Sequence, residues 1–208
     1  MRKKIHVAVV FNEPTVETLQ GRKYVSETGQ LEAGSSHAEV ISALPSTVVD
    51  MSEVGVLQER EHVEEALKKE GFRTSLFNVN EDFKRLVNFL QDKQPDLVFN
   101  LCESVGNDSI HEMHVAGLFE LFGIPYTGAP AFTLGSCLNK VRTKEILNYH
   151  KLPTPKFTVF KHPSDVNIDD LGLEFPLIVK PSREDASTGI EAASIVDNPA
   201  GLRKRVRF

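Results

Sequence analysis

The sequence predicts an α/β fold built on a parallel sheet. Short apolar runs typical of buried strands alternate with amphipathic helical patterns through the first part of the chain. Single helices between successive strands produce right-handed βαβ crossovers, which make the strands parallel. With 208 residues, 40% of them hydrophobic and 25% charged, the chain has the composition of an ordinary globular protein of one or two domains.

The first strand is expected at residues 5–11, where β-branched residues predominate. An amphipathic helix follows, with Ser52 as a candidate N-cap and Gly71 as its end. Two more strands, at residues 74–79 and 97–101, are separated by a second amphipathic helix at residues 83–90. Residues 12–51 have no sustained period and are therefore interpreted as a long irregular insertion, either a loop or a partly ordered segment.

Polar side chains follow the third strand, where ligands bind to parallel sheets. The cluster consists of Asn100, Glu103, Asn107 and Asp108. For Asn107 and Asp108 a second interpretation is equally good, because turn residues and N-caps have the same composition and Asp108 or Ser109 can cap the next helix. Glu103 is favoured as a functional residue.

The helix expected at residues 110–122 has two histidines near its start. His111 and His114 are three residues apart and so lie on neighbouring turns. They resemble a metal-binding pair only weakly, because such a pair needs a third ligand and none is evident.

The second half of the chain is organised around residues 175–190, FPLIVKPSREDASTGI. The pattern predicts a strand, a polar loop and a second strand, with Lys180 at the end of the first. A lysine there, next to the hydroxyls of Ser182, Ser187 and Thr188, is suited to an anion. An ordinary hairpin with a solvated tip is the alternative. Helices at residues 132–139 and 141–150, a strand at 156–160 and a last helix after Pro199 complete the prediction.

Several function classes are disfavoured. The chain has no GxGxxG after the first strand, no GxxxxGK[ST] and no GxSxG. A net charge of −5 argues against a dedicated nucleic-acid binder, and the basic residues 203–207 are interpreted as the exposed face of a helix. No apolar run approaches the roughly 20 residues of a membrane span. No signal peptide is evident, so the protein is expected in the cytoplasm, with no membrane partner.

Five segments in order, FNLCESVGNDS, IPYTG, LNKVRTKEIL, LPTP and IVKPSREDASTGI, resemble the ATP-grasp superfamily, and most closely the D-alanine–D-alanine ligases. The resemblance covers about residues 97–207. It implies a Rossmann-like parallel-sheet N-terminal (pre-ATP-grasp) domain at residues 1–128. A small α+β ATP-grasp subdomain, truncated, is implied at residues 129–208.

The resemblance also implies an ATP-dependent ligase that joins a carboxylate to an amine through an acyl phosphate, with ATP and Mg²⁺ as cofactors. Small amino acid or other carboxylate and amine substrates are implied, and a homodimer is possible. Implied ATP contacts are Lys140, Lys180, Arg183, Glu184, Ser187, Thr188 and Gly189. Implied catalytic residues are Glu53, Glu103 and Ser187.

Three positions differ from the family pattern. Asp185-Ala186 replaces a Gly-Ser pair, Phe11-Asn12-Glu13 replaces a Gly-Gly start, and Asn100-Leu101 replaces a His-Gly turn. All three lie on the substrate side, so the resemblance is closer on the ATP side.

Family members continue for well over a hundred residues past the matched segments, and those residues supply the adenine pocket and the Mg²⁺ ligands. The sequence is therefore interpreted as an N-terminal part that is inactive alone. The competing hypothesis is a non-catalytic nucleotide-binding or regulatory module with the same fold.

Overall fold

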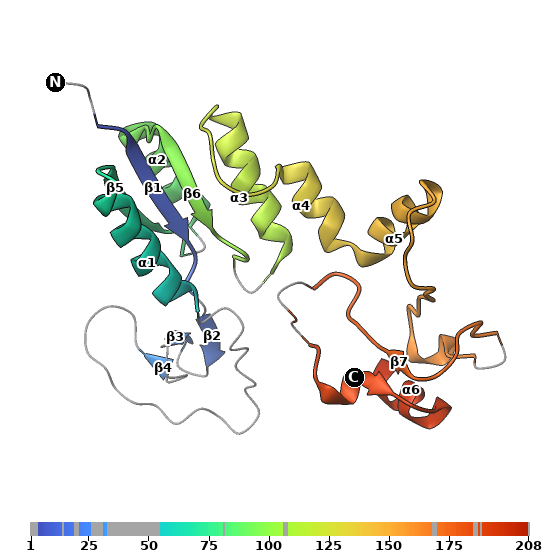
Figure 1. The fold of residues 1–208 in the computed structure, drawn as a ribbon. Helices are drawn as coiled ribbons and strands as arrows, with labels where there is room; N and C mark the ends of the chain where they lie inside the picture. The colour runs from blue at the N-terminus through green and yellow to red at the C-terminus, as the bar shows by residue number, and fades with distance from the viewer. Residues whose placement is uncertain are drawn as a thin grey trace. The chain divides into compact units, whose positions relative to one another are not determined.

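The structure is a computed structural model, and it describes residues 4–13, 15–18, 21–25, 31–32, 55–80, 82–105, 108–167, 170–184, 187 and 189–207. The chain forms two compact units, Met1–Gly135 and Ser136–Phe208. Figure 1 shows the elements of each unit. Among the described residues, no helix is both long enough and apolar enough to cross a membrane.

A three-stranded parallel sheet forms the centre of the first unit, in the order β5-β1-β6. Its strands are β1 (His6–Phe11), β5 (Arg73–Asn78) and β6 (Leu97–Leu101). All six residues of β1 are buried, as expected for a central strand covered on both faces. The α/β prediction and its parallel sheet are confirmed.

Helices cover both faces of this sheet (Figure 1). They are α1 (Val56–Lys69), α2 (Phe83–Lys93) and α3 (Ile110–Leu121). Because the chain moves from β1 to β5 and then back past β1 to β6, right-handed crossovers place α1 and α2 on opposite faces. The core contains Ala8 and Val10 of β1, with Leu86 and Leu90 of α2 and Phe119 of α3.

The start of α1 differs from the prediction. Its N-cap is Gly55, without a side-chain cap bond, so Ser52 is not the cap of this helix. Ser52 itself lies outside the described residues. By contrast, Asp82 caps α2 by accepting a hydrogen bond from the Arg85 amide.

Part of the expected irregular insertion is a second sheet. The strands β2 (Thr15–Thr18), β3 (Gly21–Val25) and β4 (Leu31–Glu32) pair antiparallel in that order. These strands show no apolar periodicity, but strand pairing is made by backbone groups and is possible with mainly polar side chains such as Thr, Glu, Arg and Lys. They correspond to the interpretation of a partly ordered insertion and not to that of a long loop.

The helix α4 (Ala131–Leu138) contains the boundary between the units, and α5 (Lys140–Tyr149) follows it. The second unit also contains η2 (Pro163–Asp165), β7 (Leu177–Ile178), η3 (Ala192–Ser194), β8 (Ile195–Val196) and α6 (Pro199–Val206). Its small core is formed by Val166, Leu171, Val196 and Leu202. Asn198 caps α6 by accepting from the Gly201 amide.

The expected hairpin is present but short. β7 and β8 pair antiparallel over two residues each, because Ala192–Ser194 forms a 3-10 turn where the second strand was expected to begin. The strand predicted at residues 156–160 does not form. Instead, Lys144 binds the segment before it, through the Thr154 hydroxyl at 2.9 Å and the Pro155 carbonyl at 2.8 Å.

Candidate functional site

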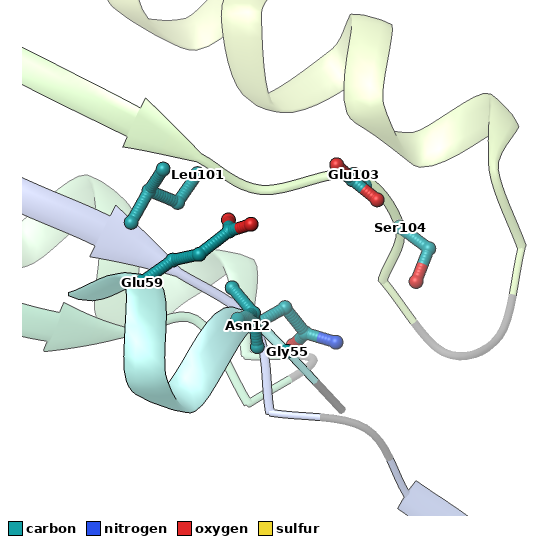
Figure 2. Close-up of a pocket in the computed structure, with 7 residues that line it drawn as sticks. Asn12, Gly55, Glu59, Leu101, Glu103 and Ser104 are labelled. Carbon is teal, nitrogen blue, oxygen red and sulfur yellow. The ribbon is translucent and has the colours of Figure 1, made fainter. Parts of the chain in front are cut away.

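A small pocket lies at the carboxyl ends of β1 and β6 in the first unit (Figure 2). This edge is the topological switch point of the sheet, because the chain runs outward from β1 to β5 on one side and reaches β6 on the other. Parallel sheets bind ligands at such points. The residues that line the pocket are Asn12, Gly55, Val56, Glu59, Leu101, Glu103 and Ser104.

Asn12 is the most informative residue of this pocket. The residue is only 7% exposed, and its Oδ1 atom is buried without a hydrogen-bond partner. Its amide nitrogen donates to the Glu13 carbonyl at 3.4 Å. An unpaired buried acceptor costs free energy, so at the edge of a pocket Asn12 Oδ1 is suited to accept from a donor group on a ligand or from water.

Two carboxylates lie in the same pocket. The Glu59 side chain extends from α1 toward the end of β6, where Glu103 follows the strand (Figure 2). With Asn12 Oδ1 they give the lining an excess of acceptors and negative charge, which suits an ammonium or other amine donor.

Arg60 of α1 contacts the side chains on both sides of Asn12. Its guanidinium lies 4.8 Å from the centre of the Phe11 ring and 3.2 Å from Glu13 Oε1. The Glu13 amide also donates to Asn78 Oδ1 at 3.3 Å. Since both neighbours of Asn12 are held, its side chain has a defined position at the edge of the pocket.

The polar cluster predicted after β6 divides into two groups. Glu103 lines the pocket, as the functional interpretation expected. Asn100 shapes the turn, since its Oδ1 accepts from the Cys102 amide at 3.2 Å. Asp108 accepts from the Ile110 amide at 3.0 Å, as a turn residue does, while the N-cap of α3 is Ser109 without a side-chain cap bond. Asn107 lies outside the described residues, as does Glu53.

His111 and His114 do contact each other, with their Nδ1 atoms 3.0 Å apart. No group of three or more His, Cys, Asp or Glu side chains within the described part of the chain is arranged to hold a metal ion.

In the second unit, Lys140 joins the start of α5 to the polar segment after β7. Its amide donates to the Ser182 carbonyl at 3.0 Å, and its ammonium donates to the Glu184 carbonyl. Asn139 caps the helix by accepting from the Arg142 amide at 3.1 Å. The two motifs LNK and VKPSRE are thus brought together by direct contacts.

Side chains of the same segment differ in exposure. Lys180 and Arg183 are exposed, and Glu184 is half-buried. Ser187 and Gly189 are exposed and have positive φ angles of 64° and 70°. Thr188, Asp185 and Ala186 lie outside the described residues.

Sequence reasoning missed Asn12, Glu59 and Arg205. The side chain of Arg205 is only 8% exposed and contacts the Gly189 carbonyl and Glu191. It is therefore not part of an exposed basic face, as was expected. For Asn12, its place directly after a buried strand was an available signal.

No family model matches the chain, but comparison with known proteins finds relatives of similar sequence. It is 41% identical over 97 residues to the D-alanine–D-alanine ligase of Ralstonia nicotianae, covering 45% of this chain and 29% of the relative. It is 33% identical over 141 residues to that of Marinomonas sp., covering 66% of this chain and 43% of the relative. Part of the chain is therefore similar in sequence to D-alanine–D-alanine ligases.

Solved ligase structures agree with this result for the fold. A D-alanine–D-alanine ligase from Bacillus anthracis, in a complex with ATP, matches with a TM-score of 0.64 at 20% identity. The match covers 98% of this chain and 52% of the ligase. The resemblance to D-alanine–D-alanine ligases and the α/β fold expected from the sequence are confirmed. The chain spans less than half the length of these curated relatives.

Proposed function

We propose that the protein is an ATP-dependent carboxylate–amine ligase. The observation that carries this proposal is the contact of Lys140 with Ser182 and Glu184, which unites the LNK and VKPSRE motifs in a chain homologous to ligases. A cationic side chain and a polar loop joined in this way make a site for polyphosphate. The ATP bound to the Bacillus anthracis ligase is consistent with that ligand.

On the ATP side, Lys140, Lys180 and Arg183 supply positive charge, and Glu184, Ser187, Thr188 and Gly189 belong to the same segment. The Lys140 ammonium donates to the Glu184 carbonyl in this structure, so a phosphate oxygen must replace that carbonyl. A phosphate carries more negative charge than a neutral carbonyl, so the exchange is favourable. Mg²⁺ is part of the proposed reaction, and it would bind with the phosphates of ATP.

The chemistry has two steps. A carboxylate oxygen of the first substrate attacks the γ-phosphorus of ATP, and ADP leaves to give an acyl phosphate. The amine of the second substrate then attacks the acyl carbon, phosphate leaves, and the nitrogen loses a proton. Fixed positive charges stabilise the transferring phosphoryl oxygens with little reorganisation.

On the substrate side, the pocket of Asn12, Glu59 and Glu103 supports an amine-bearing substrate. Asn12 Oδ1 accepts from the amine, and the two carboxylates balance its charge. Glu53 and Ser187 remain proposed catalytic residues. An assay with a panel of substrates identifies the amino acid that occupies the site.

The test measures ADP release by the whole protein with Mg·ATP and a panel of amino acids, dipeptides and hydroxy acids. We expect Lys140→Met and Lys180→Met to lower kcat/KM for ATP by roughly 10²-fold, because each removes a charge from the phosphate site. Lys156→Met, which removes an exposed lysine from the same unit, should leave activity unchanged.

A non-catalytic nucleotide-binding module is the second candidate, and the Asp185-Ala186 substitution in the loop favours it. ATP binding without ADP release, for every substrate pair tried, would support this module and reject the ligase.

A further inference from the structure

Arg205 has an unusual position for an arginine on a terminal helix. Its side chain is 8% exposed, while the neighbouring Arg203 and Lys204 are exposed. One terminal nitrogen, Nη1, donates to Glu191 Oε1 at 2.6 Å, and the other, Nη2, donates to the Gly189 carbonyl at 2.6 Å. A guanidinium holds two acceptors in one plane, which a lysine ammonium does not do.

Both acceptors belong to the turn that leads out of the polar segment. The Ile190 amide donates to the Ser187 carbonyl at 2.9 Å and closes this turn. Gly189, inside it, has φ +70°, a conformation that side-chain-bearing residues rarely adopt. The Glu191 amide donates to Ser194 Oγ at 3.1 Å, and this bond fixes the backbone of the residue whose carboxylate accepts from Arg205. Arg205 therefore binds a turn whose geometry is already restricted.

The polar segment has a first flank, Pro181–Glu184, and a second flank, Gly189–Glu191. The two flanks come together at Gly189. A Cβ atom on this residue would lie 3.1 Å from Pro181 Cγ, which is closer than side chains normally pack. Lys180 comes directly before Pro181, and Lys140 holds Ser182 and Glu184 on the same flank. Fixing Gly189 therefore also restricts Pro181 and the residue that precedes it.

We propose that Arg205 is a positioning residue for the nucleotide site. It holds the Gly189–Glu191 flank against the Pro181 flank, so that Lys180 and the backbone near Ser187 face the phosphates. The proposal rests on the proposed function, since it concerns the same site. Arg205 itself touches neither nucleotide nor substrate in this assignment.

The first arm of the test uses hydrogen exchange in the 208-residue chain without nucleotide. In Arg205→Ala we expect the Ile190 amide to exchange about tenfold faster. A factor of about ten corresponds to the free energy of roughly one lost charge-assisted hydrogen bond. The Leu202 amide, which donates to the Asn198 carbonyl within α6, reports whether the helix itself has opened. Arg203→Ala removes the same charge from the same helix and should match the wild type.

The second arm measures binding of ATP by phosphorus NMR. Arg205→Ala and Arg205→Lys should weaken binding by about tenfold, because lysine keeps the charge but not the two-pronged contact. Glu191→Gln keeps the carbonyl contact and should give a smaller loss. This milder variant tests the proposal if Arg205→Ala does not fold.

The results separate the two proposals. Unchanged exchange at Ile190 in Arg205→Ala overturns the positioning role. So does faster exchange at Ile190 with unchanged ATP affinity, since Arg205 would then be structural only. Failure of the wild type to bind ATP overturns the nucleotide role together with the proposed function, while the exchange arm still decides whether Arg205 holds the turn.

Discussion

Asn12 combines burial with an unpaired acceptor at the edge of a pocket. Such an arrangement lowers stability and is retained where a ligand provides the missing donor. We therefore expect Asn12→Leu to leave the free energy of unfolding unchanged or raise it by up to about 1 kcal/mol, because the unpaired oxygen is removed. The same change should weaken amine-substrate binding by the whole protein about tenfold.

Asn78 provides a matched control at the end of the neighbouring strand. Its Oδ1 accepts from the amides of Glu13 and Asn80, at 3.3 and 3.2 Å. Asn78→Leu should therefore lower the free energy of unfolding by about 1–3 kcal/mol, because two donors lose their acceptor. Denaturant unfolding of both variants gives the comparison. Equal destabilisation by the two substitutions would mean that Asn12 is an ordinary structural residue.

Single residues were predictable from the sequence only where a motif or a strand end identified them. Glu103 was found because it follows a predicted strand, and it does line the pocket. Arg205 was not, because its acceptors, a backbone carbonyl and Glu191, are 16 and 14 residues away and nothing in the local pattern indicates them. Burial of a charge depends on tertiary contacts, which composition does not reveal.

At the scale of elements, Glu120 connects the end of α3 to the start of α4. Its Oε1 accepts from the Tyr126 hydroxyl at 2.7 Å and from the Ala131 amide at 2.9 Å. The Ala131 amide, followed by the Tyr126 hydroxyl, lowers the pKa of Glu120. Burial, followed by the hydrogen bond to Glu120, raises the pKa of Tyr126 from 10.0 to about 12.

These two shifts predict stability losses at both ends of the pH range. A lowered pKa means that the contribution of Glu120 is lost as the pH falls below its usual 4.5 and through its folded value. A raised pKa means that the contribution of Tyr126 is complete below pH 10.0 and is lost as the pH rises toward 12. Tyr126→Phe should reduce the alkaline loss, and Glu120→Gln should reduce the acid loss, to which Glu64 and Asp165, whose pKa values are also lowered, contribute as well.

Urea unfolding at pH 3.5, 7 and 11 measures both effects, with conditions chosen as about 1 pH unit from each usual pKa. Tyr149→Phe is the control, because Tyr149 is 83% exposed. An alkaline loss that is the same in Tyr126→Phe and in the wild type would contradict the assignment to this pair.

Elements with strong apolar periodicity were predictable, and those that depend on partners were not. The strand β6 formed at the expected residues 97–101, where only Asn100 interrupts the apolar residues. Residues 156–160 alternate between polar and apolar residues but form no strand, and Lys144 binds the Pro155 carbonyl next to them. The strands β2, β3 and β4 lack an apolar pattern, and their pairing was therefore not visible in the sequence.

For the whole molecule, each compact unit contains its own group of candidate residues. The first unit contains the pocket of Asn12 and Glu103, and the second contains Lys140 and Lys180. The sequence supplied this division of roles only through the resemblance to ligases, since periodicity shows elements and not ligands.

The chain spans about half the length of the solved ligase it resembles. We therefore expect residues 1–208 alone to release no ADP and to bind ATP weakly, with a Kd on the order of 1 mM. If this weak binding comes from the phosphate side alone, inorganic tripolyphosphate should bind within about threefold of ATP, because two lysines recognise charge and not the base. Lys180→Met should weaken both ligands equally.

Phosphorus NMR of the 208-residue chain, titrated with ATP and with tripolyphosphate, measures these affinities, and Lys156→Met serves as the control for net charge. A micromolar Kd for ATP, or ADP release with any amino acid pair, would show that residues 1–208 carry more of the site than the phosphate contacts. A preference of ATP over tripolyphosphate by tenfold or more would mean that this chain also recognises the base, about 1.4 kcal/mol of binding free energy beyond its lysines.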